Sequence, residues 1–368
     1  MKSKFTNIML FIIMIMLIGA IAVFGMAIYA NITSMDTEDT IYTINTITTT
    51  FDDNEDNINV LNKNKVEEDI TVEDIDFQNE AKEKYFYEQL TDIQKVIYNG
   101  LQENKENMQD GEYKIQYGGI FSDILKEEGG SKKLGKDYQS AVESFLYDNP
   151  DVFYLDANKL FLNVETSKTI FKTTYNVYIG PAKGSTYYAD GFTSEIQVKA
   201  ALDKIEETKN TVLLRLTGNT YRDILKIHDY LVESIDYDKN YSSIGCYSIY
   251  GALVDKKCVC EGYAKALKYL LNEANIPSVI VQGSAKNMSG KTEDHAWNIV
   301  CLDNKWYYID VTWDDPIIIG EGQVAKSVHY KYFLKGSKKF DKDHTLSYQF
   351  SDKGRTYRYP VAQEYDYK

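Results

Sequence analysis

The sequence of 368 residues lacks the features that mark several common classes of protein. It has only four cysteines, all between Cys246 and Cys301, which excludes a disulfide framework and favours a functional site. Cys258 and Cys260 have C-x-C spacing, but no His or Cys pair nearby completes a tetrahedral set, so the sequence predicts no metal and no other cofactor. A net charge of −14 excludes nucleic acid as a partner.

The negative charge is concentrated in one segment. Residues 31–80 contain fourteen acidic residues, two lysines and no proline, and they are rich in Thr and Asn. This composition predicts an acidic disordered spacer, with a recognition tail as the alternative. Residues 81–368 have a net charge of only −4, so the acidity is not that of a substrate channel.

A run of 23 residues without charge extends from Ile8 to Ala30, behind Lys2 and Lys4. A bilayer core needs about 20 such residues, so the run predicts a signal-anchor helix over 1–30. The lysines precede it, which predicts a single-pass membrane protein with its C-terminal part outside the cell. A weak cleavage motif at 25–27 leaves a secreted protein with a cleaved signal peptide as the alternative. No cysteine follows the run, which excludes a lipoprotein anchor.

Residues 81–195 have the pattern of a small α+β domain. Thr91 and Gln94 form a capping-box pattern at the start of a first helix. A second helix is expected over 138–146, followed by strands over 152–155, 160–164 and 169–179.

Two further helices, over 194–213 and 221–234, open a domain expected to span 196–335. His228 lies on the apolar face of the second of these helices, and we interpret it as a core histidine with satisfied hydrogen bonds. A β extension is expected over 336–368.

Cys260 is the first candidate for catalysis. Residues 262–274 have an apolar stripe at helical spacing, which places Cys260 just before or in the first turn of a helix. The helix dipole and free N–H groups there favour a thiolate and can hold an oxyanion. Gly262 fits a place where the backbone comes close to a substrate. A buried structural cysteine is the alternative for Cys260.

His295 and Asp310 are expected to meet on a β-hairpin. Residues 295–302 and 305–312 alternate, with Asp303-Asn304 as the turn between them. If Leu302 faces Lys305, the residue numbers of each opposed pair add up to 607, so His295 faces Thr312. Asp310 is then a diagonal neighbour of His295 on the same face of the hairpin. A three-residue turn would separate the two. Asp314 and Asp315 lie beyond the strand and are expected to be solvated or capping residues.

All three tryptophans, Trp297, Trp306 and Trp313, lie in this hairpin. They are expected to form the wall of a dry groove around a thiolate and an imidazole, or to be ordinary core aromatics. A thiolate attacks a carbonyl, an imidazole moves the proton and a carboxylate orients the imidazole, so the three residue types together point to acyl transfer.

The sequence resembles the transglutaminase-like superfamily, especially its bacterial, surface-associated members. The resemblance covers about 221–335 and rests on four segments: Tyr250–Leu253, Val259–Ala264, His295–Asn298 and Trp306–Asp314. The segment 148–155 looks like the one that precedes this domain in low-GC Gram-positive proteins.

The resemblance implies an α+β, papain-like core, in which a helix that carries the nucleophile packs on an antiparallel sheet. It also implies Cys260 as nucleophile, His295 as general base and acid, and Asp310 as the orienting carboxylate. Ser248 or Tyr250 is the candidate for a second oxyanion donor. No calcium loop of the D-x-D-x-D-G kind is present, so the calcium dependence of animal crosslinking enzymes is not carried over.

These observations predict an outward-facing cysteine enzyme that acts on proteins or peptides at the cell envelope. A thioester would be resolved by water, as in a peptidase or amidase, or by a lysine amine, as in a transglutaminase; hydrolysis is favoured because water needs no acceptor site. The alternatives are an inactive scaffold that binds surface proteins or glycans and a sensor module. Cys258 is interpreted as a buried thiol, or as a disulfide partner of Cys260, Cys246 or Cys301.

Overall fold

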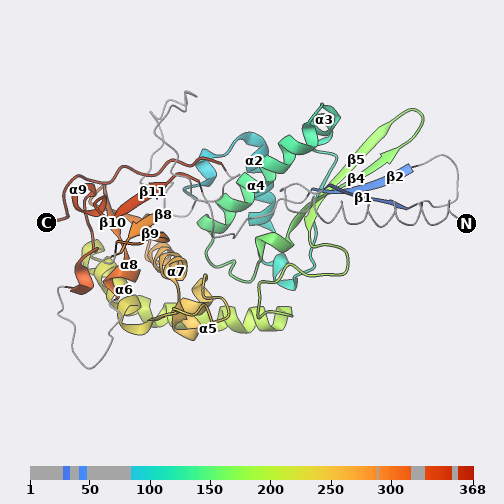
Figure 1. The fold of residues 1–368 in the computed structure, drawn as a ribbon. Helices are drawn as coiled ribbons and strands as arrows, with labels where there is room; N and C mark the ends of the chain where they lie inside the picture. The colour runs from blue at the N-terminus through green and yellow to red at the C-terminus, as the bar shows by residue number, and fades with distance from the viewer. Residues whose placement is uncertain (1–27, 34–40, 48–83, 288–289, 316–327, 350–354) are drawn as a thin grey trace, which may run out of the picture. The chain divides into compact units, whose positions relative to one another are not determined.

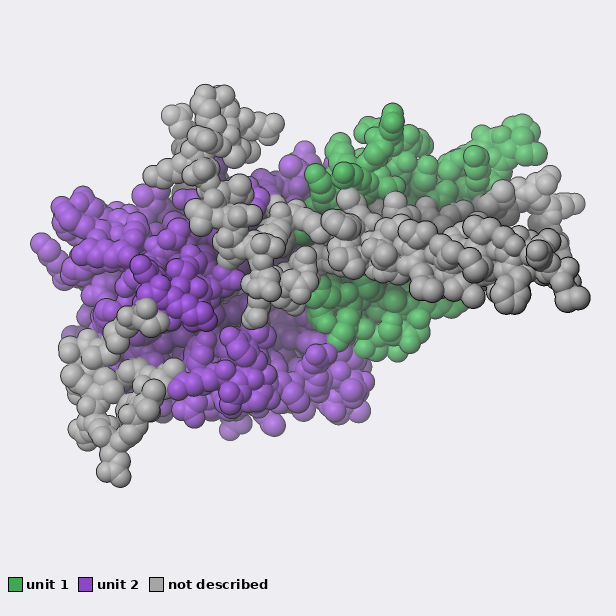
Figure 2. Space-filling view, viewed as in Figure 1, with its two compact units in different colours: residues 1–51, 106–139, 156–187 green, residues 52–105, 140–155, 188–368 purple. Residues whose placement is uncertain are grey.

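The computed structural model describes residues 28–33, 41–47, 84–287, 290–315, 328–349 and 355–368 (Figure 1). The chain divides by its internal contacts into two compact units, which Figure 2 shows in different colours. Unit 1 comprises 1–51, 106–139 and 156–187, and unit 2 comprises 52–105, 140–155 and 188–368. The predicted small domain over 81–195 is therefore divided between both units.

Unit 1 is built on a five-stranded antiparallel sheet in the order β1-β2-β4-β5-β3. The strands are β1 (Ile28–Thr33), β2 (Ile41–Ile47), β3 (Ile115–Gly118), β4 (Phe161–Lys168) and β5 (Thr173–Gly180). The short helices η2 (Asn107–Asp110), α3 (Ser122–Lys126) and η3 (Ala157–Lys159) and the first half of α4 (Gly130–Asp148) complete it. The buried Tyr138 donates a hydrogen bond to Leu160 O at 2.6 Å and so ties α4 to the start of β4. Only the second and third predicted strands form, because 152–155 makes turns.

The N-terminal predictions fall mainly outside the described residues. Residues 1–27 of the expected anchor and most of the expected spacer are not described, while 28–33 and 41–47 form β1 and β2. The sequence predicted the end of a helix for 28–30 and a disordered spacer beyond it, whereas the structure has strands there. Backbone pairing of β1 with β2 and of β2 with β4 supplies the hydrogen bonds of these strands. Within the described ranges, no helix has the length and apolar character that crossing a bilayer requires.

Unit 2 contains the longer helices. They are α2 (Asp92–Glu103), the end of α4, α5 (Glu195–Leu213), α6 (Thr220–Ser234) and α7 (Cys260–Glu273), with η1 (Tyr87–Gln89) before α2. The predicted capping box is confirmed: both reciprocal hydrogen bonds between Thr91 and Gln94 are present. The start predicted for α5 is confirmed as well, since Ser194 caps it through Gln197 N.

A four-stranded antiparallel sheet in the order β10-β9-β8-β11 forms the centre of unit 2. Its strands are β8 (Ser278–Lys286), β9 (Thr292–Leu302), β10 (Lys305–Ile309) and β11 (His344–Ser347). Helix α7 is held to the central strand β9 by Asn298, whose Nδ2 donates to Ala264 O at 3.0 Å. The arrangement confirms the predicted helix on an antiparallel sheet.

Short elements connect these parts. A parallel pair, β6 (Asp236–Tyr237) with β7 (Lys257–Cys258), flanks the π-helical turn η4 (Gly251–Asp255) and leads directly into α7. After β10 follow α8 (Val311–Asp314), η5 (Val328–Tyr330) and α9 (Ser337–Phe340). The C-terminal segment returns to the sheet, where Ala362 forms a β-bridge with Trp306.

Candidate active site

Cys260 is the first residue of α7, and its side chain is partly buried against the core. Val259 caps the helix in an extended conformation, and its N–H donates to Cys246 O at 3.0 Å. The first N–H groups of a helix have no carbonyl one turn earlier to bond to. The Cys260 sulfur therefore lies at the positive end of a 14-residue helix, as the sequence predicts.

The hairpin has the predicted register. Lys305 pairs with Leu302, so opposed positions sum to 607. Asp303 and Asn304 form the two-residue turn with positive φ angles of 52° and 60°, which Asp and Asn tolerate better than most residues. His295, on β9, pairs with Gly283 of β8 on its other side.

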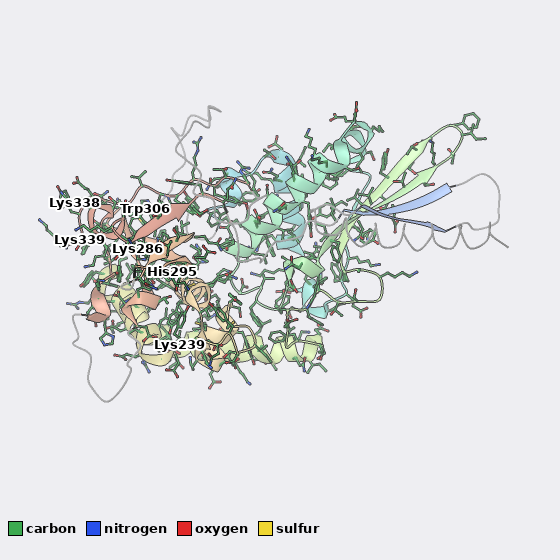
Figure 3. All side chains as sticks on the ribbon, viewed as in Figure 1. Lys239, Lys286, His295, Trp306, Lys338 and Lys339 are labelled. Atoms are coloured by element: carbon green, nitrogen blue, oxygen red, sulfur yellow. The ribbon has the colours of Figure 1, made fainter. Side chains whose placement is uncertain are left out.

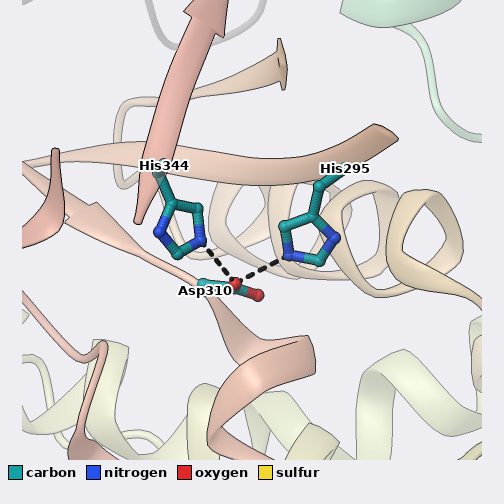
Figure 4. A group of neighbouring side chains, drawn as sticks. All are labelled: His295, Asp310 and His344. Carbon is teal, nitrogen blue, oxygen red and sulfur yellow. Dashed lines mark hydrogen bonds and ion pairs between the residues drawn. The ribbon is translucent and has the colours of Figure 1, made fainter. Parts of the chain in front are cut away.

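Asp310 reaches His295 from the end of a strand rather than from within it. Strand β10 ends at Ile309, and Asp310 caps the short helix α8 by accepting a hydrogen bond from Trp313 N at 3.1 Å. The predicted strand over 305–312 is therefore too long by its last three residues. The other oxygen, Oδ2, lies 2.7 Å from His295 Nε2 (Figure 4).

The charges of this pair reinforce each other. Burial by itself lowers the pKa of His295, but the Asp310 carboxylate and the Cys260 side chain together raise it to about 10. Burial raises the pKa of Asp310, yet the imidazoles of His295 and His344 outweigh it and hold that pKa far below its usual value. At neutral pH the pair is thus an imidazolium and a carboxylate, and His295 also interacts with Cys260.

Two of the three tryptophans enclose the imidazole of His295. The Trp313 ring lies 5.4 Å from it and the Trp297 ring 6.0 Å, centroid to centroid. Trp306 is on β10 (Figure 3) and bridges to the C-terminal segment instead. Trp297 and Trp313 are thus the tryptophans that contact His295, and Trp297 also belongs to the buried hydrophobic core, as the alternative of an ordinary core aromatic expects.

The remaining predicted site residues lie in or beside the loop before α7. Ser248 donates to Gly245 O at 2.8 Å and accepts from Tyr250 N at 3.2 Å, so its hydroxyl fixes the loop. The Tyr250 ring stacks on Phe153 at 5.8 Å. Among the described contacts, neither side chain meets the His295–Asp310 pair.

Gly262 allows close packing within the chain. A Cβ at this position would lie 2.6 Å from Cys258 Cβ and 2.7 Å from Cys246 O. The sequence analysis expected a close approach of the backbone to a substrate at Gly262, but the atoms that come close are those of Cys258 and Cys246.

The other cysteines are buried thiols. Cys246, Cys258 and Cys301 are free in the structure, as the interpretation of Cys258 as a buried thiol requires. Burial, with the neighbouring Cys260 and Cys246, raises the pKa of Cys258 well above its ordinary value. Cys258 is therefore far less suited to be a nucleophile than Cys260.

His344 is a site residue that the sequence analysis did not identify. It lies on β11, which pairs with the opposite edge of β8, and its Nε2 is 3.1 Å from the same Asp310 Oδ2 that His295 contacts (Figure 4). The chain has only four histidines, which is the one signal in the sequence that could have drawn attention to it.

A second buried histidine–aspartate pair lies on α6 and α8. His228 is fully buried between Asp229 and Asp314, each 3.2 Å from one of its ring nitrogens, which confirms the predicted satisfied core histidine. The prediction for Asp314 was wrong: it is fully buried, because its carboxylate also accepts from Tyr332 N at 2.8 Å. Asp315 is partly buried and accepts from Tyr263 OH.

The nitrogen and oxygen atoms that His295, Asp310 and His344 could offer to a metal ion all lie within 4.8 Å of one another. Asp310 Oδ2, however, lies at hydrogen-bonding distance from both nitrogens. A zinc ion bound at about 2.0–2.1 Å would have to take the position between these atoms and draw His295 away from Cys260. We therefore interpret the three residues as a hydrogen-bonded network.

The geometry provides the parts of a thiol acyl-transfer site. Cys260 at the N-terminus of α7 interacts with the His295 imidazole, and the buried Asp310 carboxylate is hydrogen-bonded to Nε2 of that imidazole. Residues 210–311 match the model of the Transglutaminase-like superfamily, so this part of the chain is a transglutaminase-like domain. Members of this superfamily are typically cysteine peptidases or transglutaminases.

Two curated relatives are kyphoscoliosis peptidases. The chain is 24% identical to the protein of Mus musculus over 166 residues, which are 42% of this chain and 24% of the relative. It is 24% identical to that of Homo sapiens over 139 residues, 35% of this chain and 20% of the relative. The match thus spans about a quarter of these relatives or less.

Similar solved structures include a TGase, at 18% identity with a TM-score of 0.28 over 46% of this chain and 48% of that one. A candidate cysteine protease from Cytophaga hutchinsonii matches at 16% identity with a TM-score of 0.25, over 41% and 57%. The periplasmic domain of TgpA from Pseudomonas aeruginosa matches at 10% identity with a TM-score of 0.24, over 42% and 70%. At such scores the likeness carries no argument about this chain.

Proposed function

We propose that the chain is a cysteine enzyme that cleaves or transfers amide acyl groups through Cys260, His295 and Asp310. The observation that carries the proposal is the position of His295, which interacts with Cys260 and has its Nε2 2.7 Å from Asp310. Nδ1 is then the ring nitrogen left to face the sulfur. Such an imidazole can hold a thiolate and deliver a proton.

Acylation begins when the Cys260 thiolate attacks the carbonyl carbon of a substrate amide. A carbon–sulfur bond forms, and the carbonyl oxygen becomes an oxyanion that the N–H groups at the start of α7 can stabilise. His295 then gives its proton to the amide nitrogen, the carbon–nitrogen bond breaks and ammonia or an amine leaves. Asp310 keeps the His295 ring in place throughout, in its charged and in its neutral form.

The thioester is then resolved by a second nucleophile. In hydrolysis His295 takes a proton from water, the hydroxide attacks the carbonyl, and the carbon–sulfur bond breaks to return the thiolate. In transfer a lysine amine takes the place of water. We favour hydrolysis because water needs no dedicated acceptor site.

We place the enzyme outside the cytoplasm, with proteins or wall peptides of the envelope as substrates. The support is the uncharged run from Ile8 to Ala30 behind Lys2 and Lys4. The location is tested by cysteine-directed labelling of intact cells with a reagent that does not cross membranes.

The proposed chemistry is tested by replacing Cys260 with Ala and measuring hydrolysis and amine incorporation on glutamine-containing peptides and protein substrates. We expect Cys260→Ala to abolish turnover while the circular dichroism spectrum stays that of the wild type. Cys301→Ala is the matched control, since Cys301 is a buried free thiol on β9 with no contact to the triad among the described interactions. A Cys260→Ala protein that keeps full activity would favour a binding scaffold instead.

A further inference from the structure

His344 contacts Asp310, the carboxylate that also holds His295. It is 3% exposed, and its Nε2 lies 3.1 Å from Asp310 Oδ2, while His295 Nε2 lies 2.7 Å from the same oxygen. The two imidazole rings are 5.7 Å apart, centroid to centroid. Asp310 therefore lies between two histidines (Figure 4).

The other nitrogen of His344 also faces a carboxylate. Nδ1 lies 2.8 Å from Asp343 Oδ1, and Asp343 accepts a further hydrogen bond from Tyr332 OH at 2.8 Å through Oδ2. A neutral imidazole has an N–H on only one nitrogen, whereas an imidazolium has one on both. The geometry at His344 thus fits a cation that donates to Asp343 and Asp310 together.

We propose that His344 is a positioning residue that acts through Asp310 on the catalytic imidazole of His295. Its hydrogen bond fixes the Asp310 carboxylate in the orientation that His295 needs. Its charge also competes for that carboxylate, so Asp310 holds the proton on His295 less firmly and His295 remains able to release it. The inference rests on the proposed function of the triad.

The aromatic surroundings suit an ordered second imidazole. Phe340 stacks on the His344 ring at 4.0 Å, and Trp313 and Trp297 lie at 4.6 and 5.1 Å. These rings fix the plane of His344 and exclude water, so its electrostatic effect on Asp310 is weakly screened. His344 also lies beyond residues 210–311, so the matched domain does not include it.

Among the residues that the structure describes, several charged and titratable groups lie around the pair. Cys260 of α7 faces His295, and Asp310 lies between the histidines. Asp341 and Asp343 approach His344 from the segment after α9. Tyr332 bonds to Asp343, and its hydroxyl oxygen also accepts a hydrogen bond from Lys331 Nζ at 2.7 Å. Asp314 on α8 and Asp310 repel each other electrostatically.

The test uses two replacements of His344 that separate orientation from charge. His344→Gln keeps an N–H donor toward Asp310 but has no charge, whereas His344→Leu has neither. His228→Gln is the matched control, because His228 is also a buried histidine bonded to a buried aspartate but lies outside the triad. The assay follows acylation and deacylation of the full chain by p-nitrophenyl acetate over a range of pH.

We expect the deacylation rate to rise with pH as His295 loses its proton in the acyl-enzyme. Removing a cation about 6 Å away should move the midpoint of that rise up by about one pH unit in both His344 variants. His344→Leu should also lower the plateau rate about tenfold or more, while His344→Gln stays within about threefold of the wild type. His228→Gln should change neither value.

The outcomes separate the two proposals. If the wild type shows no acylation beyond that of Cys260→Ala, the proposed function fails and the role of His344 fails with it. If the wild type acylates and deacylates but both His344 variants keep its midpoint and plateau, the positioning role alone is overturned. A His344→Gln variant that loses as much plateau rate as His344→Leu, at an unchanged midpoint, would show a packing role only and would also overturn it.

Discussion

Replacing Asp310 by Asn should reveal how strongly the buried ion pair stabilises the fold. The rise in the pKa of His295 from 6.5 to about 10 corresponds to about 5 kcal/mol in favour of the imidazolium, shared between Asp310 and Cys260. Removing one partner of a buried pair typically costs about 3–5 kcal/mol. Asn keeps the size and one acceptor, so we expect a loss of about 3 kcal/mol near pH 6.

The loss should depend on pH in a defined direction. His295 has a raised pKa in the folded state, so its stabilisation is complete below about pH 6.5 and disappears as the pH rises through 10. Asp310 has a lowered pKa, so its stabilisation is present above about pH 4 and disappears only as the pH falls below that. The cost of Asp310→Asn should therefore be greatest between about pH 5 and 7 and shrink toward pH 10.

Urea unfolding followed by tryptophan fluorescence measures this cost at pH 6, 8 and 10. All three tryptophans lie between residues 297 and 313, so the signal reports the unit that contains the site. A cost below about 1 kcal/mol at pH 6, or an equal cost at pH 6 and 10, would refute the reasoning.

Asp314→Asn is the matched control. Asp314 is also fully buried and bonded to a histidine, but burial outweighs its hydrogen bonds and raises its pKa to about 6. Its charge is therefore a penalty in the folded state above pH 6, and this penalty is absent below about pH 4. Because Asn removes it, Asp314→Asn should cost less than about 1 kcal/mol at pH 8 or stabilise the protein.

Two more predictions follow from α7. Gly262→Ala places a Cβ against Cys258 and the Cys246 carbonyl, so overpacking should destabilise the protein by about 1–3 kcal/mol; an unchanged urea midpoint would contradict this. Iodoacetamide at pH 7.5 should label Cys260 in the folded protein and leave Cys258 unmodified, because Cys258 is fully buried and burial raises its pKa. Peptide mass spectrometry checks this, with urea-unfolded protein as the control in which both are labelled, and equal folded-state labelling would contradict it.

Local patterns predicted the parts of the site that are close in sequence. The apolar stripe over 262–274 placed Cys260 at a helix start because helical periodicity is a local property. The two-residue turn at 303–304 fixed the register of β9 and β10, and with it the side of the sheet on which His295 and Asp310 meet. The capping box at Thr91 was readable for the same reason.

Predictions failed where contacts between segments distant in sequence decide the conformation or the burial of a residue. Residues 152–155 look like a strand but make turns, with one isolated bridge from Leu155 to Tyr188. Asp314 looks solvated from its neighbours in sequence, yet it is buried by His228 and the backbone of Tyr332. No short-range pattern contains these partners.

The sequence by itself determined the helix that begins at Cys260, the hairpin and the side of the sheet on which His295 and Asp310 meet, since each depends on periodicity or on a turn of fixed length. Only the tertiary structure brought Cys260 to His295 and added His344 to Asp310. The reason for His344 is the order of the sheet: β11 pairs with β8, and β8 pairs with β9, so histidines 49 positions apart in the chain converge on one carboxylate. Strand order is set by the burial of whole faces and not by local sequence.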